Sequence, residues 1–144
     1  MTRAVIDSSV VVKWIIGEDD SATALELRRH YLFVAPEFLL AEAANAVLTK
    51  VRRGQVTESE ARSAAELIGQ FSIVFEPLQP LVEDAVALGL DLRHPIYDCF
   101  FLVLAAKLGC PLVTADRALI EKSANLQVSV LSMQQAIDRA LALD

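Results

Sequence analysis

The sequence predicts an α/β fold, a central parallel sheet of about five strands flanked by helices. Short apolar runs alternate with longer amphipathic runs along the chain, which is typical of a parallel sheet covered on both faces. The length of 144 residues fits one domain, and a hydrophobic share of 54% suffices for a core without disulfides. No linker, repeat or low-complexity segment divides the chain. We therefore expect a single domain over residues 1–144.

The predicted strands are short apolar runs that stop at a proline or a polar residue. Right-handed crossovers between parallel strands leave few topologies. Ligands of such sheets bind beyond the carboxyl ends of the strands, so we expect the functional site at that edge. The five predicted strands are Ala4–Ile6, Leu32–Ala35, Ile73–Phe75, Leu112–Thr114 and Val128–Leu131.

The segments between these strands carry apolar residues at helical spacing, with recognisable end signals. Gly54 suits the end of a helix, and Thr57 with Glu60 forms a capping-box pattern. Pro95 suits the first turn of another helix. The predicted helices are Val10–Ile16, Ser21–Arg29, Glu37–Arg53, Thr57–Gln70, Pro80–Leu90, Pro95–Leu108, a short helix capped by Asp116, and Met133–Leu143.

Four acids fall near the predicted ligand edge. Asp7 follows the first strand directly, and Asp116 follows the fourth by two residues. Asp98 lies in the first turn of its helix, and Glu42 lies inside the helix after the second strand. Three of them also have a structural interpretation, because Asp7 and Asp116 suit helix N-caps and Asp98 suits a helix dipole.

Glu42 is harder to explain as a structural residue. Its neighbours at positions 39–41, 43 and 44 are all apolar, so this acid should be buried or half buried. A buried charge needs a partner or a metal ion. Asn45, three residues on, shares the same face of the helix. Because hard cations such as Mg²⁺ prefer carboxylate oxygen and water, the four acids together predict a divalent-metal site.

The segments around these acids resemble the motifs of PIN-domain proteins. AVIDSSVVVKW, from Ala4 to Trp14, resembles the opening of the family, and APEFLLAEAANAVLTKVRRG, from Ala35 to Gly54, resembles its second motif. HPIYDCFFLVLAAKLGCPLVTADRAL, from His94 to Leu119, resembles its third and fourth motifs. No single motif is specific, but the ordered set covers about Arg3 to Leu131 in the family's order and spacing.

Within that family the chain resembles the VapC-type ribonuclease toxins of type II toxin–antitoxin pairs. The resemblance implies an endoribonuclease that needs Mg²⁺ or Mn²⁺ and hydrolyses RNA phosphodiester bonds with metal-activated water. It also implies a homodimer, held inactive by a small VapB-like antitoxin. By position it implies catalytic and metal-binding roles for Asp7, Glu42, Asp98 and Asp116, and supporting roles for Ser8, Ser9, Asn45 and Thr114.

Several other residues have simpler interpretations. Lys50, Arg52 and Arg53 end a helix, where cations suit the dipole. The alternative is a rim that grips phosphate, formed with the substrate-binding candidates Lys13 and Arg117. Trp14 follows a run of valines, which favours a core position over a base-stacking platform. The histidines His30 and His94 form no acid–base pair in the sequence, and a histidine in a loop is usually just solvated. The alternative for His94, which precedes Pro95 near the predicted site, is a phosphate contact.

The composition and charge limit which binding partners and which cellular compartment we expect. A net charge of −6 counts against a general nucleic-acid binder, but it allows an enzyme that holds an anionic substrate through a metal ion. Cys99 and Cys110 lack the spacing of a zinc site and are expected to be buried, reduced thiols. Met1–Val5 lacks a signal-peptide run, and Cys99–Ala106 is too short to span a bilayer. We therefore expect a cytoplasmic protein.

Two other functions are compatible with parts of this pattern. An acid after the first strand also occurs in phosphotransferases with a DxD motif, but the second position here is Ser9. The other rival is a catalytically silent PIN-like module that binds RNA or an antitoxin. The presence of all four acids argues against that module.

Overall fold

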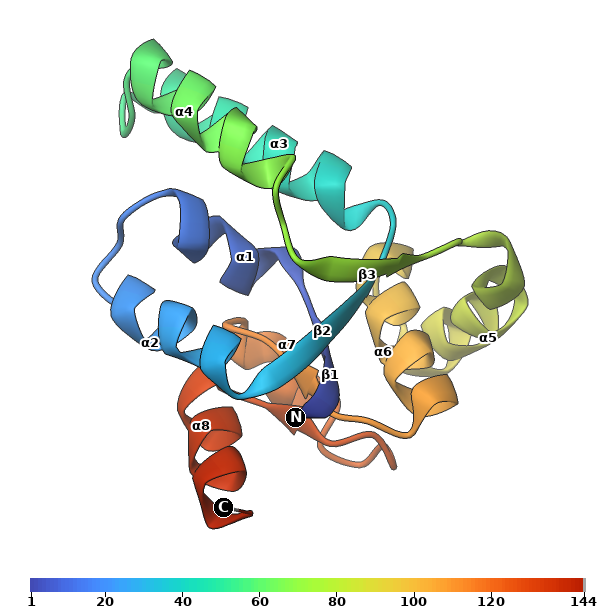
Figure 1. Cartoon of the computed structure of the whole chain (residues 1–144). Coiled ribbons are helices and arrows are strands. Elements are labelled where there is room, and N and C mark those ends of the chain that lie inside the picture. The colour runs from blue at the N-terminus through green and yellow to red at the C-terminus, as the bar shows by residue number, and fades with distance from the viewer. Residues whose placement is uncertain (144) are drawn as a thin grey trace.

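The computed structural model describes residues 1–143, and it contains the predicted five-stranded sheet (Figure 1). All four strand pairings are parallel, in the spatial order β3-β2-β1-β4-β5. The α/β class and the parallel sheet are therefore confirmed. The strands are β1 (Thr2–Ile6), β2 (Tyr31–Pro36), β3 (Ile73–Glu76), β4 (Leu112–Val113) and β5 (Val130–Leu131).

The last two strands are shorter than the sequence predicted. Thr114 lies outside β4, although its N–H still donates to the carbonyl of Leu131 at 3.0 Å. β5 begins at Val130 rather than Val128. The backbone ladder therefore continues slightly beyond the assigned strands, and it brings the residues after β4 beside the end of β1.

Every predicted helix is present, with shifted ends. The helices are α1 (Ser8–Ile15), α2 (Ser21–Glu26), α3 (Leu39–Arg52), α4 (Glu58–Ile68), α5 (Val82–Leu92), α6 (Ile96–Leu108), α7 (Arg117–Lys122) and α8 (Met133–Ala142), with single 3-10 turns η1 (Leu27–Arg29) and η2 (Gln79–Leu81). The start of α3 moves from Glu37 to Leu39 because the Glu37 N–H donates to the Glu76 carbonyl at 2.9 Å. The capping box of Thr57 and Glu60 is confirmed.

Helix α6 forms the centre of the fold. Its residues Cys99–Ala105 are all buried, and it packs against β1, β2 and β4, with α5 on its other side. In Figure 1, α3 and α4 form a helical pair at one end of the molecule, beyond α1. This arrangement fixes the first turn of α6 and the inner face of α3 beside the carboxyl ends of β1 and β4, where the acids were predicted to meet.

Trp14 is a core residue, as the sequence predicted. Its ring packs against Phe33 and Phe71, with centroids 5.4 and 5.7 Å away. The indole N–H donates to the carbonyl of Ala24 at 2.7 Å. The Trp14 ring therefore packs α1 against the core, and its N–H is already hydrogen-bonded, so it is not free to stack on a base.

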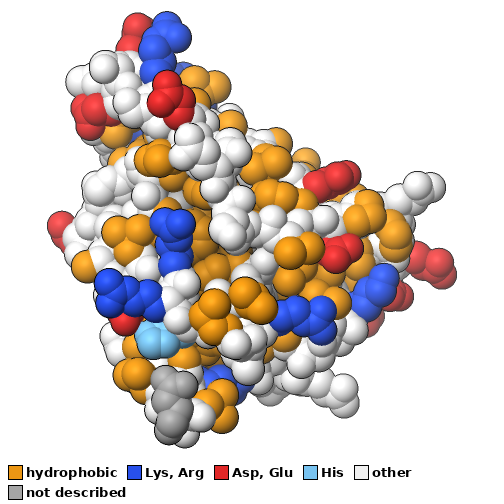
Figure 2. Space-filling model, in the orientation of Figure 1, with side chains coloured by type: hydrophobic (Ala, Val, Ile, Leu, Met, Phe, Trp, Pro, Cys, Tyr) orange, Lys and Arg blue, Asp and Glu red, His pale blue; other side chains and the backbone are white. Residues whose placement is uncertain are grey.

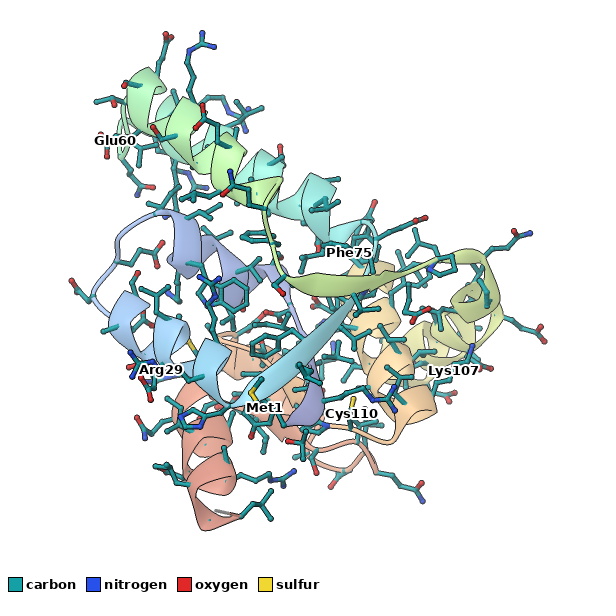
Figure 3. The ribbon with its side chains drawn as sticks, in the orientation of Figure 1. Met1, Arg29, Glu60, Phe75, Lys107 and Cys110 are labelled. Atoms are coloured by element: carbon teal, nitrogen blue, oxygen red, sulfur yellow. The ribbon has the colours of Figure 1, made fainter. Side chains whose placement is uncertain are left out.

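Both cysteines are free thiols. Cys99 is buried as expected, whereas Cys110 is only half buried. Cys110, labelled in Figure 3, lies two residues before β4 and so at the amino edge of the sheet, opposite the predicted site. The backbone there is joined by the Val5 N–H, which donates to the carbonyl of Pro111 at 2.8 Å. Within residues 1–143, no helix has the length and apolar character that crossing a membrane requires.

Candidate active site

Asp7 is the most deeply buried acid at the carboxyl edge of the sheet, with 5% of its surface exposed. It follows β1 and caps α1, so the N-cap interpretation is confirmed. Its Oδ1 accepts from the Ser9 N–H at 3.1 Å and from the Ser9 hydroxyl, and its Oδ2 accepts from the Thr114 hydroxyl at 2.6 Å. Both acceptor sites of Oδ1 are therefore used within the protein, whereas Oδ2 keeps one lone pair for another ligand.

Burial raises the pKa of Asp7 to about 6. The hydrogen bonds from Ser9 and Thr114 lower this pKa, and the negative charge of Asp98 raises it. Burial is the largest of these effects, so Asp7 gives up its proton at a higher pH than an ordinary aspartate, and a positive charge beside it would favour the charged form.

Glu42 reaches the same region from α3 and is half buried, as expected. Burial raises its pKa to about 7, and the charges of Asp7 and Asp98 add to that rise. The nearby Ser8 side chain lowers this pKa slightly. The Oε1 atom of Glu42 is buried without any hydrogen-bond partner. A buried carboxylate oxygen in that state is costly, and a cation or a bound ligand would relieve the cost.

Asp98 lies in the first turn of α6, and its side chain is 31% exposed. Its charge raises the pKa of both Asp7 and Glu42. The Oδ2 atom of Asp98 lies 2.6 Å from Nε2 of His94. The sequence placed His94 near the site as a solvated residue or a phosphate contact, but it did not predict this hydrogen bond to Asp98. The signal for the bond was the spacing of four residues across the start of a helix.

Asp116 is placed differently from the other three acids. It is exposed and caps α7, with its Oδ1 accepting from the Leu119 N–H at 3.2 Å. Its own N–H donates to the hydroxyl oxygen of Thr114 at 3.1 Å, and that hydroxyl in turn donates to Asp7. Asp116 is therefore linked to Asp7 through the Thr114 hydroxyl, and its own carboxylate caps α7.

The predicted supporting residues divide into two kinds. Ser9 and Thr114 are joined directly to Asp7, and Ser9 also accepts from the Ala115 N–H at 2.9 Å. Ser8 faces Glu42. Asn45 is exposed on α3, and its role stays a prediction.

Of the two predicted substrate-binding cations, Lys13 is engaged elsewhere. Its ammonium pairs with Glu18 at 2.7 Å and Asp20 at 2.9 Å, and Glu18 also pairs with Lys50 at 2.8 Å. These pairs join α1, the following loop and α3, and a role for Lys13 at a phosphate-binding rim stays a prediction. Arg117 is exposed beside Asp116, and its role stays a prediction.

The donor set suits a divalent cation in its chemistry. It offers carboxylate oxygens, including a buried oxygen without a partner and two acids that burial and mutual repulsion make hard to ionise. Across residues 1–143, no group of three or more His, Cys, Asp or Glu side chains is arranged closely enough to hold a metal ion. Like charges favour such separation, and side-chain rotation would be needed to bring the carboxylates to one ion.

Fold and site together define a parallel α/β protein with a cluster of acids at the carboxyl edge of its sheet. The PIN domain family model matches residues 4–125, a span that includes all four acids. The chain therefore belongs to the PIN-domain family.

Relatives and solved structures agree with this assignment. Ribonuclease VapC3 of Pyrobaculum aerophilum is 30% identical over 83% of this chain and 94% of its own length. Ribonuclease VapC1 of Mycobacterium tuberculosis is 30% identical over 83% of this chain and 90% of its own length. The structure of PAE2754 from Pyrobaculum aerophilum has a TM-score of 0.72 at 18% identity, covering 98% of this chain and 90% of that one. A toxin–antitoxin complex from Klebsiella pneumoniae has a TM-score of 0.61 at 16% identity, with 90% and 97% covered, and both structures support the fold.

Proposed function

We propose that this protein is a metal-dependent endoribonuclease and the toxin of a toxin–antitoxin pair. The observation that carries the proposal is the placement of Asp7, Glu42 and Asp98 after or beside the carboxyl ends of the strands in a PIN-domain chain whose curated relatives are named ribonucleases. The ordinary structural roles of these acids do not account for the unpartnered Glu42 oxygen.

Asp7, Glu42 and Asp98, with Asp116 at the margin, would hold one or two Mg²⁺ or Mn²⁺ ions. When bound, such an ion activates water for attack on phosphorus and offsets charge on the phosphate. The protein supplies the geometry around it. Ser9 and Thr114 keep both oxygens of Asp7 oriented. The net charge of −6 makes a counter-charge at the site necessary for an RNA phosphate to approach.

The test is a cleavage assay on purified, partner-free protein. A mixed RNA pool is incubated with Mg²⁺, with Mn²⁺ and with EDTA. Variants Asp7→Asn, Asp98→Asn and Asp116→Asn are compared with Asp91→Asn, which changes an exposed acid of α5. We expect metal-dependent cleavage by the wild type and Asp91→Asn, and none by the other three. Tight RNA binding without cleavage under any condition would instead favour the silent binding module.

The proposed antitoxin contact is a groove of about 470 Å³ between α3 and α4. Its lining is mostly apolar and includes Val47, Leu48, Val51, Ala61, Ala65 and Ile68. An amphipathic helix of the antitoxin would fit such a groove. Ala65→Arg should abolish inhibition by the antitoxin while leaving RNA cleavage intact, and the matched control is Ala87→Arg on the exposed side of α5. Unimpaired inhibition of Ala65→Arg would place the antitoxin elsewhere.

The proposed homodimer contact is the exposed apolar face of β2 and β3. Figure 2 shows hydrophobic side chains gathered over the middle of this face of the molecule. Leu32 and Val74 are 52% and 61% exposed, and β3 is an edge strand. Light scattering should show a dimer for the wild type and a monomer for Val74→Lys. The matched control Leu141→Lys on α8 should remain a dimer, and a dimeric Val74→Lys would exclude this face.

A further inference from the structure

We propose that His94 is a positioning residue for Asp98, and that the imidazole holds the Asp98 carboxylate in the orientation the active site uses. This inference rests on the proposed metal-dependent function. His94 would not touch the substrate or the reacting atoms. It would act through one hydrogen bond to one oxygen of Asp98, leaving the other oxygen for the site.

The contact is short and lies at a fixed place in the fold. Nε2 of His94 is 2.6 Å from Oδ2 of Asp98. His94 lies two residues before Ile96, the first residue of α6, and Asp98 lies in the first turn of that helix. The imidazole is 13% exposed and the carboxylate 31% exposed, so water competes weakly for the hydrogen bond. Partners of this kind orient the carboxylates that bind metal ions in proteins.

The other ring nitrogen shows which tautomer fits the pocket. A carboxylate only accepts hydrogen bonds, so Nε2 must carry the proton that joins the pair. Nδ1 of His94 is buried without a hydrogen-bond partner. A proton on Nδ1 would create a buried N–H with no acceptor, at the full cost of its desolvation. The pocket therefore favours the tautomer in which His94 donates to Asp98 and to nothing else.

The surrounding loop does not depend on the imidazole. The His94 N–H donates to the carbonyl of Gly89 at 3.3 Å, and Nζ of Lys122 donates to the carbonyl of Arg93 at 3.1 Å. A Cβ added to Gly89 would lie 3.5 Å from the His94 carbonyl oxygen, which shows how closely the two backbones approach. Because backbone contacts already hold the turn, the side chain of His94 is free to serve Asp98.

The protein contains a matched control for this pair. Nε2 of His30 lies 3.1 Å from Oε1 of Glu26, also four residues apart, and the His30 side chain is 14% exposed. His30 precedes β2 and so lies at the amino edge of the sheet, away from the acids. A general effect of losing a half-buried histidine should appear at both positions, and a positioning effect should appear only at His94.

The experiment compares His94→Leu, His94→Gln and His30→Leu with the wild type. Mn²⁺ binding to the metal-free protein is measured by titration calorimetry without RNA, and melting is recorded in EDTA. Leucine removes the donor, whereas glutamine keeps an N–H donor on a side chain of similar length. We expect His94→Leu to bind Mn²⁺ about 10- to 100-fold more weakly. His94→Gln should recover most of that loss, and His30→Leu should bind like the wild type. In RNA cleavage, kcat should fall for His94→Leu at unchanged KM.

The outcomes separate this inference from the proposed function. Wild-type protein that binds Mn²⁺, together with His94→Leu that binds it equally well, overturns the inference alone. Failure of His94→Gln to recover binding also overturns it, because the donor would then not be what matters. A similar loss in His30→Leu would show a general structural effect and overturn it too. If the wild type binds no Mn²⁺, both the proposed function and this inference fall.

Discussion

The hydroxyl of Thr114 donates to Oδ2 of Asp7 at 2.6 Å, across 107 positions of sequence. The same hydroxyl oxygen accepts from the Asp116 N–H at 3.1 Å. Thr114 is fully buried and follows β4, which pairs with β1. The Thr114 hydroxyl therefore orients the carboxylate of Asp7 and also bonds the backbone of Asp116, so it connects the two acids that follow β1 and β4.

Replacing Thr114 with valine should impair both stability and cleavage. Valine has nearly the same shape but no hydroxyl, so Asp7 loses a donor that lowers its pKa. The pKa of Asp7 should rise further, and the acidic limb of the pH–rate profile should move to higher pH. Unpaired buried groups should also lower the free energy of unfolding by roughly 1–3 kcal/mol. Thr114→Ser, which keeps the hydroxyl, is the control. An unshifted profile for Thr114→Val would contradict this account.

The sequence was sufficient to place the acids at one edge, because parallel strands end together and each acid follows or flanks a strand. The burial of Glu42 also followed from its apolar neighbours. The bond between Thr114 and Asp7 could not be predicted, since it requires β4 to lie beside β1, and strand order is a tertiary property. The engagement of Lys13 was missed for a similar reason, because Glu18 and Asp20 lie in a loop whose path the sequence does not specify.

His94 shows a different limit. Its relation to Asp98 needs the exact start of α6 and a loop that buries the ring. Helix boundaries are the part of a sequence-based assignment that is least certain. The expectation of a merely solvated loop histidine was wrong because the contacts of Gly89 and Lys122 draw the turn inward.

Lys13→Gln should affect stability and leave the chemistry unchanged. Its side chain is 14% exposed and pairs with two carboxylates that are themselves partly exposed. Loss of such a pair should lower the free energy of unfolding by roughly 1–3 kcal/mol, between the values for surface and buried ion pairs. Urea unfolding measures this loss, and kcat and KM for RNA should match the wild type. A higher KM for RNA in Lys13→Gln would instead show that Lys13 contacts a phosphate of the substrate.

Arg117→Ala should have the opposite profile. Arg117 is exposed beside Asp116, so its removal should leave stability within about 0.5 kcal/mol of the wild type. If it contacts a phosphate, KM should rise, and the slope of log affinity against log salt should fall by about 0.7, as for one contact with a single strand. Arg62→Ala, on exposed α4, is the charge-matched control. An unchanged salt slope would remove Arg117 from the substrate-binding residues.

The stability of the metal-free protein should depend on pH through Asp7 and Glu42. Their pKa values in the folded protein are raised to about 6 and about 7, above unfolded values of about 4. The folded state therefore binds more protons in this range, and stability is lost as pH rises from about 4 to about 7. Asp7→Asn and Glu42→Gln should remove part of that loss. In EDTA, their stability relative to the wild type should increase from pH 4.5 to pH 8, by roughly 1–3 kcal/mol for the buried Asp7.

With saturating Mn²⁺, the stability of the wild type should rise with pH instead of falling, because the cation competes with protons for the same carboxylates. The rise in melting temperature on adding Mn²⁺ should be larger at pH 8 than at pH 5, and it should be absent in Asp7→Asn.

The carboxylates of Asp7 and Glu42 repel one another. The stability gained in EDTA by the double variant Asp7→Asn/Glu42→Gln should therefore be smaller than the sum of the gains of the two single variants. Melting curves at four pH values, with and without Mn²⁺, measure all of these quantities. If the melting temperatures of the wild type and both single variants change with pH in the same way, the pKa values of Asp7 and Glu42 are not raised by burial. The electrostatic argument for a cation at this edge of the sheet would then fail.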